Sequence, residues 1–580
     1  MILKYLKGKE WGIIVACVVL IGLQVYLDLE IPGYMSAITN IISTHGTSDM
    51  VMAEGWGMIA CALGSLVSSI IVGYMATWVA TSLSKRLREL QFDKVESFSM
   101  EEINKFSTAS LITRSTNDIT QIQTALAMGL QITIKAPILA VWAIIKISGK
   151  SWQWTAATSV AVFVLILIIG LLMFFVTSRY KKIQWLTDNL NRTTRENLTG
   201  IRVIRAYNAE GYQENRFDQA NEDLTANNLF TTRAMSVMMP SMTTIMSLLS
   251  LSVYWIGAIL ISSAGTASQL TLFSDMVVFS AYAMQIVMAF MMLIILFMIL
   301  PRATVAARRV EEVINTESTI LDGTVTTAPN NEVGEISFKN VGFKYPGASD
   351  YVLKDVSFDV HKGETVAFIG STGSGKSTLV NLVPRFYDVT EGQITIDGVD
   401  IREYTQDALH SKMGYVPQKA VIFAGTVSSN VTYGSKFDTE EDIRKAISIA
   451  QSTDFVEKME GKYNSLISQG GTNVSGGQKQ RISIARAVCR RPEIYIFDDS
   501  FSALDYKTDH MLRNALKKET GGTTSLIVAQ RIGTIMDADK IVVIDEGRIV
   551  GIGKHKELLK TCPVYYEIAS SQLSEEELSV

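Results

Sequence analysis

An uninterrupted apolar run limits what this chain can fold into. Residues 154–176, WTAATSVAVFVLILIIGLLMFFV, contain no charged side chain. As an α-helix, which rises about 1.5 Å per residue, this run would extend about 34 Å and cross the hydrocarbon core of a bilayer. Residues 276–300 form a second charge-free run, and residues 234–274 are long enough for one span and a loop. The first half of the chain is therefore predicted to lie in a membrane.

Six membrane spans are predicted in total. The chain has 580 residues, of which 48% are hydrophobic and only 19% charged, and the mean hydropathy is +0.21. The amino terminus, MILKYLKGKEWG, is basic and lacks a small-residue cleavage site, which indicates an uncleaved anchor. The formal net charge of −4 gives no indication of nucleic-acid binding, and the four scattered cysteines indicate neither a disulfide framework nor a zinc site. The spans are expected near residues 11–38, 56–81, 125–148, 154–176, 234–262 and 276–300.

The distribution of Lys and Arg predicts the orientation of these spans. Basic residues gather between the second and third spans and between the fourth and fifth, whereas residues 39–55 contain none. The positive-inside rule then places both termini and the two basic loops in the cytoplasm, for a protein of the cell (plasma or inner) membrane. These loops are too long to be simple connections, so we expect the helices to continue beyond the bilayer.

The composition changes to that of a soluble α/β domain at Glu335. Short apolar strands there alternate with Gly-containing turns and helical patterns, and a polar segment precedes them. The sequence therefore predicts a membrane domain over residues 1–315, a linker over 316–334 and a soluble α/β domain over 335–573.

A glycine-rich loop in the second half predicts nucleotide binding. Gly370, Gly375, Lys376 and Ser377 satisfy the pattern GxxxxGK followed by Ser or Thr, between an apolar strand and the start of a helix. Such a loop directs backbone N–H groups at phosphates, while the lysine reaches the β- and γ-phosphates and the serine helps to hold Mg²⁺. Further along, the buried-strand pattern IYIF ends at Asp498, which is well placed to orient the same ion.

A second anion site is indicated between these two motifs, in VSGGQKQRISIARAV. Ser475 and, three residues later, Gln478 form a capping box at the start of an amphipathic helix. Two glycines beside the cap let a phosphate approach the backbone closely. Considered alone, this stretch is more simply explained as an ordinary helix cap.

Taken in order, the motifs resemble those of an ABC-transporter ATPase. The order is P-loop, glutamine loop (GYVPQ, with Gln418), SGGQ signature, acid pair, SALD and switch position (IVAQR), and GFKYP upstream matches the aromatic loop. The first half resembles the six-span exporter domain, in which SLITRSTNDITQIQ and ENLTGIRVIRAYNAE match two cytoplasmic coupling loops. The resemblance covers essentially the whole chain. It implies a six-span membrane domain with long cytoplasmic extensions, an ABC nucleotide-binding domain with a helical subdomain, and export driven by ATP.

The resemblance also implies residue roles in a dimer of two half-transporters, whose two ATP molecules each lie between one P-loop and the other chain's signature. Tyr345 would stack on adenine, and Asp499, Gln530 and Gln418 would serve hydrolysis. The implied Mg²⁺ ligands are Ser377, Gln418 and Asp498. The implied ATP-binding residues are Tyr345, Gly370, Ser371, Thr372, Gly373, Ser374, Gly375, Lys376, Ser377, Thr378 and, toward the partner's ATP, Ser475, Gly476, Gly477 and Gln478.

Two positions depart from the family pattern at the hydrolytic step. Asp499 stands where the family usually has the Glu that orients the attacking water, and Gln530 stands where it usually has His. An aspartate is one methylene shorter, which retracts its carboxylate by about 1.5 Å, and a misplacement near 1 Å can cost on the order of 100-fold in rate. Gln530 can donate a hydrogen bond but cannot carry a proton. Gln469, before the signature, replaces another usual Glu. The alternative explanation is that Asp499 and Gln530 are substitutions that a working ATPase tolerates.

These departures predict a site that binds ATP well and hydrolyses it poorly. A weak site with an intact signature favours pairing with a different chain, as in the heterodimeric multidrug exporters of bacteria that the pattern resembles. The predicted cargo is hydrophobic or amphiphilic compounds such as drugs. The alternatives are a lipid or peptide exporter of the same fold, and an ATP-gated regulator or channel subunit that does not pump.

Charged and sulfur-containing residues in the spans are the candidates for contact with cargo. Asp28, Glu30 and Lys135 lie in or near predicted spans, where charges usually face a cavity or each other. If Asp28 faced the cargo, cationic amphiphiles would be favoured. Met284 and Met288 belong to a Met-rich sixth span, which suits an adaptable apolar surface but also ordinary helix packing.

Overall fold

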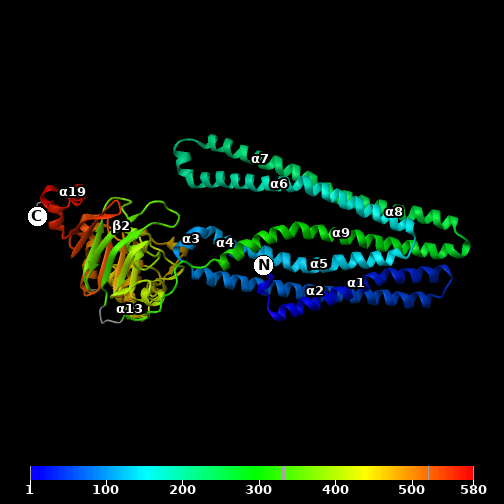
Figure 1. Ribbon diagram of the computed structural model, residues 1–580, viewed down its shortest axis with the longest axis horizontal. Helices are drawn as coiled ribbons and strands as arrows, with labels where there is room; N and C mark the ends of the chain where they lie inside the picture. Colours follow the sequence, from blue (N-terminus) through cyan, green and yellow to red (C-terminus); the bar gives the residue numbers. More distant parts are fainter. Residues whose placement is uncertain (1, 329–332, 520, 579–580) are drawn as a thin grey trace. The chain divides into compact units, whose positions relative to one another are not determined.

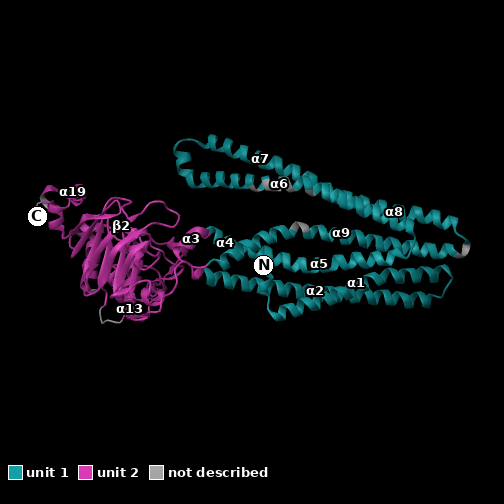
Figure 2. Ribbon diagram, in the orientation of Figure 1, with its two compact units in different colours: residues 1–94, 109–316 teal, residues 95–108, 317–580 magenta. Residues whose placement is uncertain are grey.

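The protein was analysed as a computed structural model that describes residues 2–328, 333–519 and 521–578. It divides into two compact units (Figures 1 and 2). Unit 1 consists of Met1–Lys94 and Ala109–Thr316, and unit 2 of Val95–Thr108 and Glu317–Val580. A short segment within the membrane half of the sequence therefore packs with the second unit. The predicted linker includes residues 329–332, which lie outside the described residues.

Unit 1 is built from long helices. Six segments of the described chain are apolar and long enough to cross a membrane, and all six predicted spans lie within them. This confirms the predicted fold of the first half. The elements are η1 (Ile2–Tyr5), α1 (Gly8–Ser43), α2 (Ser48–Glu96), α4 (Thr108–Thr113), η2 (Arg114–Asp118), α5 (Ile119–Ser148), α6 (Trp152–Ala206), α7 (Glu210–Ser236), α8 (Met238–Ser263) and α9 (Thr266–Asn315).

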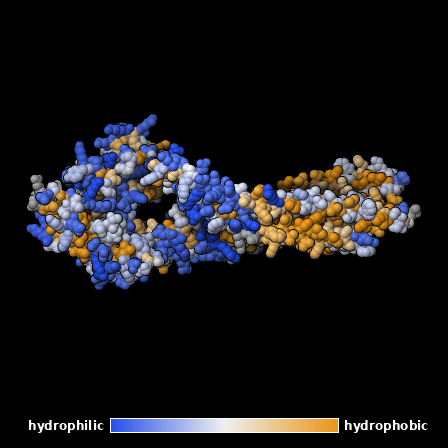
Figure 3. Space-filling model, turned by 90° about the horizontal axis from the view of Figure 1, so that it is seen from above, coloured by the Kyte–Doolittle hydropathy of each residue, from blue (hydrophilic) through white to orange (hydrophobic). Residues whose placement is uncertain are grey.

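Several of these helices are much longer than a membrane span requires. A span needs about 20 residues, whereas α2 has 49, α6 has 55 and α9 has 50. Hydrophobic side chains gather on the right-hand part of the surface in Figure 3. The three helices are thus longer than one crossing of a bilayer requires, which agrees with the length of the predicted basic loops.

Within unit 1, α6 lies beside α7 and α8, and α5 packs along α9 (Figure 1). The apolar core of the bundle includes Trp154 and Phe279, both fully buried, with ring centroids 5.5 Å apart. The indole N–H of Trp154 donates to the carbonyl of Val253 at 3.0 Å, so the ring contributes apolar area without leaving a buried donor unpaired.

A π-helical turn, η2, interrupts the helix at the start of α5. The extra residue in such a turn rotates the side chains that follow it. In this chain Arg114 reaches α9, where it donates to the carbonyl of Arg309 and to Glu312, both at 2.8 Å. The buried Asp118 pairs with the Arg309 guanidinium at 3.2 Å. Hydrogen bonds and ion pairs therefore connect the first predicted coupling loop to α9, the last helix of unit 1.

Unit 2 contains two main sheets, one antiparallel and one largely parallel. The first has strand order β2-β1-β4-β5 and the second β12-β11-β3-β10-β9-β6, with a two-stranded β7-β8 ribbon apart. The strands are β1 (Ile336–Phe343), β2 (Leu353–Val360), β3 (Thr365–Ile369), β4 (Glu391–Ile396), β5 (Val399–Asp400), β6 (Met413–Val416), β7 (Gly425–Thr426), β8 (Leu466–Ile467), β9 (Ile494–Asp498), β10 (Thr524–Val528), β11 (Lys540–Asp545) and β12 (Arg548–Gly553).

Helices flank these sheets and form a helical subdomain around the signature. Their apolar faces pack into the buried clusters of unit 2, which agrees with the predicted α/β fold. The helices are α3 (Met100–Phe106), α10 (Lys376–Leu382), α11 (Gln406–Ser411), α12 (Val427–Val431), α13 (Glu440–Ile449), α14 (Thr453–Val456), η3 (Lys462–Asn464), η4 (Gln469–Gly471), α15 (Gly476–Cys489), α16 (Tyr506–Glu519), α17 (Ile532–Ile535), α18 (His555–Thr561), α19 (Pro563–Ser570) and α20 (Glu575–Leu578).

Four adjacent strands, β3, β10, β9 and β6, run parallel, so their carboxyl ends meet at one edge of the sheet. The P-loop follows β3, and Asp499 directly follows β9. Gln530 and Gln418 each lie two residues after a strand, β10 and β6 respectively. Segments that are far apart in the sequence are thereby brought to one place.

Helix α3 is the part of the first half that belongs to unit 2. Ser99 caps it, and Glu102 accepts hydrogen bonds from the Ser99 N–H at 2.8 Å and the Thr319 N–H at 3.1 Å. At its other end Asn104 donates to the hydroxyl of Tyr387 at 2.9 Å. This short helix, next to the predicted coupling loop, is thus held at both ends by residues that follow the membrane domain.

Candidate nucleotide-binding site

The P-loop forms the turn between β3 and α10. Gly375 has a φ of 102°, and a Cβ there would lie 2.8 Å from Leu353, so the turn requires glycine. Lys376 is only 8% exposed, and its ammonium group donates to the carbonyls of Gly370 at 3.0 Å and Ser371 at 2.7 Å. Burial lowers the pKa of Lys376. The ammonium group therefore folds back onto the loop that is predicted to hold the phosphates.

Ser377 and Asp498 lie together as the predicted metal ligands. The Ser377 hydroxyl donates to Oδ1 of Asp498 at 2.7 Å, and Asp498 is 4% exposed. Burial raises the pKa of Asp498, and the hydrogen bond from Ser377 opposes this shift. The described residues contain no group of three or more His, Cys, Asp or Glu side chains that could hold a metal. One carboxylate and one hydroxyl suit Mg²⁺ when phosphate oxygens complete its coordination.

Asp499 is contacted by both predicted catalytic glutamines. Its Oδ2 accepts a hydrogen bond from Nε2 of Gln530 at 2.8 Å and another from Nε2 of Gln418 at 3.3 Å. The backbone N–H of Asp499 donates to the carbonyl of Val528 at 3.0 Å, which joins the ends of β9 and β10. The φ of Asp499 is 46°, a left-handed conformation that Asp tolerates better than most residues. Two amide groups thus converge on one carboxylate oxygen.

The electrostatics of Asp499 combine opposing effects. Burial raises the pKa of its carboxyl, whereas hydrogen bonds, first that from Gln418 and then that from Gln530, act in the opposite direction. Neither amide can accept a proton, so Asp499 is the group in this constellation that can act as a base. Oδ2 is therefore engaged by two amide donors.

Tyr345 lies at the P-loop, as the aromatic-loop resemblance implies. Its hydroxyl is 3.0 Å from the Thr378 hydroxyl. Its half-buried ring meets Phe343 and Tyr387 edge to face, at centroid distances of 5.0 and 5.3 Å. The adenine-stacking role of Tyr345 stays a prediction.

The signature forms a capped helix start of its own. Ser475 N–H donates to Gln478 Oε1 at 2.9 Å and Gln478 N–H donates to Ser475 Oγ at 3.3 Å, which confirms the predicted capping box at α15. Ser475 and Gly476 are exposed, and a Cβ at Gly476 would meet nothing within 4 Å. The hydrogen bonds of the cap stay within the signature, which leaves its glycines open to a ligand. Its predicted role toward a partner's ATP stays a prediction.

Sequence reasoning missed two residues that support this site. Gln572, after α19, bonds to the backbone on both sides of Arg531, beside Gln530. Tyr387 joins Tyr345 to Asn104 of α3. Neither position belongs to a motif, and no spacing in the sequence relates them to the P-loop.

The predicted cargo residues form ion pairs in unit 1. Asp28 pairs through Oδ2 with the Lys135 ammonium at 3.2 Å and accepts a hydrogen bond from Ser65. Glu30 pairs with Lys146 at 2.9 Å. Sequence reasoning missed Lys146, although it lies eleven residues after Lys135, about three helical turns along the same face. The carboxylates of α1 thus face cations of α5, the second of the two arrangements expected for charges in a span.

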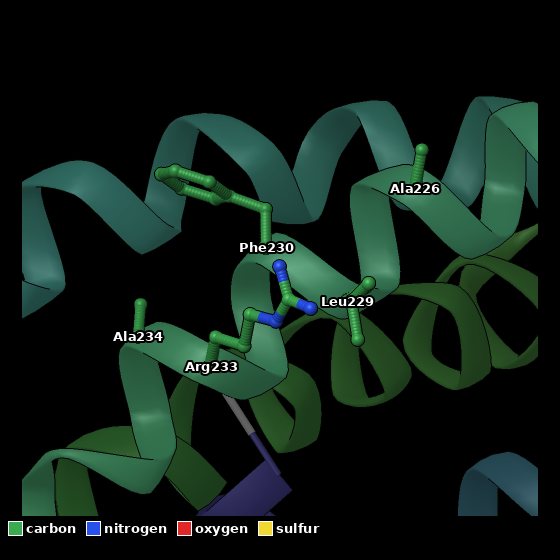
Figure 4. A pocket seen from close by; sticks show the side chains of 5 residues that line it. All are labelled: Ala226, Leu229, Phe230, Arg233 and Ala234. Carbon is green, nitrogen blue, oxygen red and sulfur yellow. The ribbon is translucent and has the colours of Figure 1, made fainter.

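The two methionines differ in exposure: Met284 is half-buried, whereas Met288 is 44% exposed. A separate open pocket of about 610 Å³ lies on α7 (Figure 4), lined by Ala226, Leu229, Phe230, Arg233 and Ala234. It contains one guanidinium and no acid or base partner, so it offers no catalytic constellation.

Comparisons with known proteins agree with this organisation. A family model described as ABC transporter matches residues 353–502, and one described as ABC transporter transmembrane region matches residues 13–301. The chain resembles a bacterial Atm1-family ABC exporter solved with ATP bound, with a TM-score of 0.80 and 24% identity over 97% of this chain and 98% of that one. That likeness concerns the fold.

Sequence relatives of similar length are found in several bacteria. The chain is 36% identical to an ABC transporter ATP-binding protein of Mycobacterium bovis, over 94% of this chain and 93% of that protein. It is 32% identical to a multidrug resistance ABC transporter ATP-binding and permease protein of Lactococcus lactis, over 94% and 91%. It is 30% identical to an ATP-dependent lipid A-core flippase of Vibrio vulnificus, over 88% and 86%. The chain therefore belongs to the ABC transporter family, as a multi-pass half-transporter of the exporter type that couples ATP hydrolysis to export.

Proposed function

We propose that this chain is the slow subunit of a heterodimeric exporter in the cell membrane. Its own P-loop binds ATP with Mg²⁺ and hydrolyses it slowly. Its signature completes the partner's site, where most hydrolysis takes place. Closure of the two nucleotide-binding domains then drives alternating access in the membrane domains, and hydrophobic or amphiphilic compounds leave the cytoplasm.

The observation that carries this proposal is the set of groups around Asp499. The family's usual Glu and His are both replaced, while the predicted ATP-binding residues are retained. The shorter carboxylate accepts amide hydrogen bonds from Gln530 at 2.8 Å and Gln418 at 3.3 Å on a single oxygen. A retracted carboxylate beside an amide that cannot carry a proton orients and activates an attacking water poorly, because reactivity depends steeply on placement. Binding of ATP depends on other residues and is preserved.

The proposed pairing with a different chain rests on a contrast within this chain. Its P-loop side carries the two replaced residues, whereas its signature is intact. Slow hydrolysis at both sites of a homodimer would leave an exporter with little turnover. An intact signature, with Ser475 and Gly476 exposed, is useful only if it faces a P-loop that hydrolyses ATP. A partner that supplies Glu and His at the two replaced positions would provide that P-loop.

Two relatives point to the class of cargo. One is called a multidrug resistance transporter and the other a lipid A-core flippase, and the molecules in both names are compatible with an apolar pathway. Asp28 is paired with Lys135, so this carboxylate is not an isolated anionic site for a cation, and the proposed cargo is selected by apolar character more than by charge. A lipid cargo is the second candidate, because the flippase matches over 88% of this chain.

Magnesium-dependent ATP binding should weaken as the pH falls toward the pKa of the Asp498 carboxyl. The metal needs the ionised form of Asp498, and because burial raises the pKa of this carboxyl, protons compete at a higher pH than for an exposed Asp. Below that pKa the affinity should fall by at most about tenfold per pH unit. Calorimetric titration of the purified transporter with ATP in the presence of Mg²⁺, repeated over a series of pH values, measures this affinity.

The control for this titration is Asp498→Asn, in which the nucleotide's own protonation remains and the side-chain carboxyl is gone. The variant should bind more weakly with a shallower pH dependence. Identical pH profiles for both proteins would contradict a role of Asp498 in metal binding.

Restoring the family residues should accelerate hydrolysis at this chain's P-loop. Asp499→Glu extends the carboxylate, and Gln530→His supplies a group that can carry a proton. We expect the double variant to release phosphate from this site at least about tenfold faster, since misplacement by 1 Å can cost on the order of 100-fold. Single-turnover measurement on the intact transporter, with the partner's P-loop lysine replaced, isolates this site.

The matched control is Asp355→Glu, because Asp355 is exposed and has a similar left-handed φ of 53°. It should leave the rate unchanged. If the double variant also leaves it unchanged, the slow site is not explained by Asp499 and Gln530.

The purified chain by itself should hydrolyse ATP slowly, and its complex with the partner chain should hydrolyse ATP faster. We expect at least about a tenfold difference in ATPase rate, because the partner supplies the catalytic carboxylate. Gly476→Glu in this chain should abolish the gain, since a carboxylate at the signature repels the partner's phosphates. Rapid turnover by the isolated chain that is lost in Asp499→Asn would contradict the heterodimer.

The transport function is tested in inverted membrane vesicles. An exporter with apolar cargo should accumulate a hydrophobic fluorescent dye in the presence of ATP. Lys376→Ala should weaken ATP binding at this site by about 10- to 150-fold, because one charge-assisted hydrogen bond is worth about 1.5–3 kcal/mol. A fluorescent lipid accumulating in place of the dye would favour the lipid candidate. Absence of ATP-dependent movement of either would favour a regulatory subunit.

A further inference from the structure

The segment after α19 contacts the loop that carries Gln530. Nε2 of Gln572 donates to the carbonyl of Gln530 at 2.9 Å, and the backbone N–H of Ile532 donates to Oε1 of Gln572 at 2.9 Å. One side-chain amide therefore bonds to the backbone on both sides of Arg531. Only one orientation of the amide satisfies both contacts, because one needs a donor and the other an acceptor.

This clamp fixes the backbone from which the Gln530 side chain extends. From that backbone Nε2 of Gln530 reaches Oδ2 of Asp499 at 2.8 Å. The side chain of Arg531 donates to the carbonyl of Ser502 at 3.3 Å. Without the clamp, a turn of the peptide on either side of Arg531 would redirect Gln530.

The clamp rests on a firmly packed helix. Tyr565 and Ala569 of α19 are fully buried in the apolar cluster that also contains Ile532. The hydroxyl of Tyr565 lies 2.7 Å from Nδ1 of His555, and the backbone N–H of Gln572 donates to the carbonyl of Ala569 at 3.0 Å. Gln572 thus connects a fixed helix of the carboxyl-terminal region to the switch loop.

We propose that Gln572 is a positioning residue for ATP hydrolysis at this chain's P-loop and acts through Gln530. It sets the direction of the Gln530 side chain toward Asp499 and, with nucleotide bound, toward the γ-phosphate. This role concerns the placement of the loop that carries Gln530. It does not depend on how fast this chain's P-loop hydrolyses ATP. It goes beyond the proposed function, because it assigns part of the catalytic geometry to a segment outside every motif.

The test measures hydrolysis at this chain alone within the intact transporter. A photoactivatable azido-ATP, labelled on either the α- or the γ-phosphate, marks each chain separately, and loss of γ-label relative to α-label reports hydrolysis. Gln572→Ala should slow this loss by about three- to tenfold, the effect of one or two hydrogen bonds. The ATP concentration for half-maximal labelling should change less than twofold.

Two further variants distinguish positioning from general destabilisation. Gln572→Glu keeps the acceptor for Ile532 but places a carboxylate oxygen against the carbonyl oxygen of Gln530, so it should slow the loss of γ-label at least as much as Gln572→Ala. Ser571→Ala removes a neighbouring exposed hydroxyl, which bonds only to the carbonyl of Ile568, and should behave as the unaltered chain. Equal rates for Gln572→Ala and Ser571→Ala would overturn the proposal.

A double-mutant cycle with Gln530→Ala completes the test. Because Gln572 acts through Gln530, the double variant should hydrolyse ATP no more slowly than Gln530→Ala alone. Effects that multiply independently, or a weakening of ATP labelling in step with the rate, would show that Gln572 has a different role.

Discussion

The hydrogen bonds that converge on Oδ2 of Asp499 connect most of what distinguishes this chain. They form because β9, β10 and β6 are neighbouring parallel strands, so that Asp499, Gln530 and Gln418 end at the same edge of the sheet. A Glu would reach farther toward the γ-phosphate. In this chain the carboxylate is shorter, and both amides contact it. The proposed slow hydrolysis follows from that shorter reach and from the amide at the switch position, and the proposed pairing with a different chain follows from slow hydrolysis.

In the membrane half, two charged residues of α1 lie close to opposite charges. Asp28 and Glu30 of α1 face Lys135 and Lys146 of α5, and an uncompensated charge in that region would be costly. Such pairs join α1 to α5, while Arg114 and Asp118 join the π-helical turn to α9. The helices of the membrane half therefore have polar contacts between them in addition to their apolar packing.

Much of this organisation could be predicted from the sequence, because local patterns determine it. Apolar runs predict the spans, the P-loop spacing predicts the phosphate site, and Ser475 with Gln478 predicts the helix cap. Contacts between distant segments could not be predicted in this way. The approach of Gln572 to Gln530 and the docking of Asn104 on Tyr387 depend on tertiary packing, which leaves no periodic pattern in the sequence. The spacing of Lys146 from Lys135 places both on one helical face, but it does not identify Glu30 as the partner of Lys146. The resemblance identified Asp499 and Gln530 as unusual, but only the structure gives the hydrogen bonds between them.

The central claim is that ATP remains intact at the P-loop beside Asp499 while the other site of the transporter turns over. The most direct measurement is the identity of the nucleotide in each pocket of the intact transporter, trapped during steady turnover and assigned to its chain. We expect ATP in this chain's pocket and mainly ADP in the pocket of its partner chain. Equal amounts of ADP in the two pockets, formed at equal rates, would contradict it.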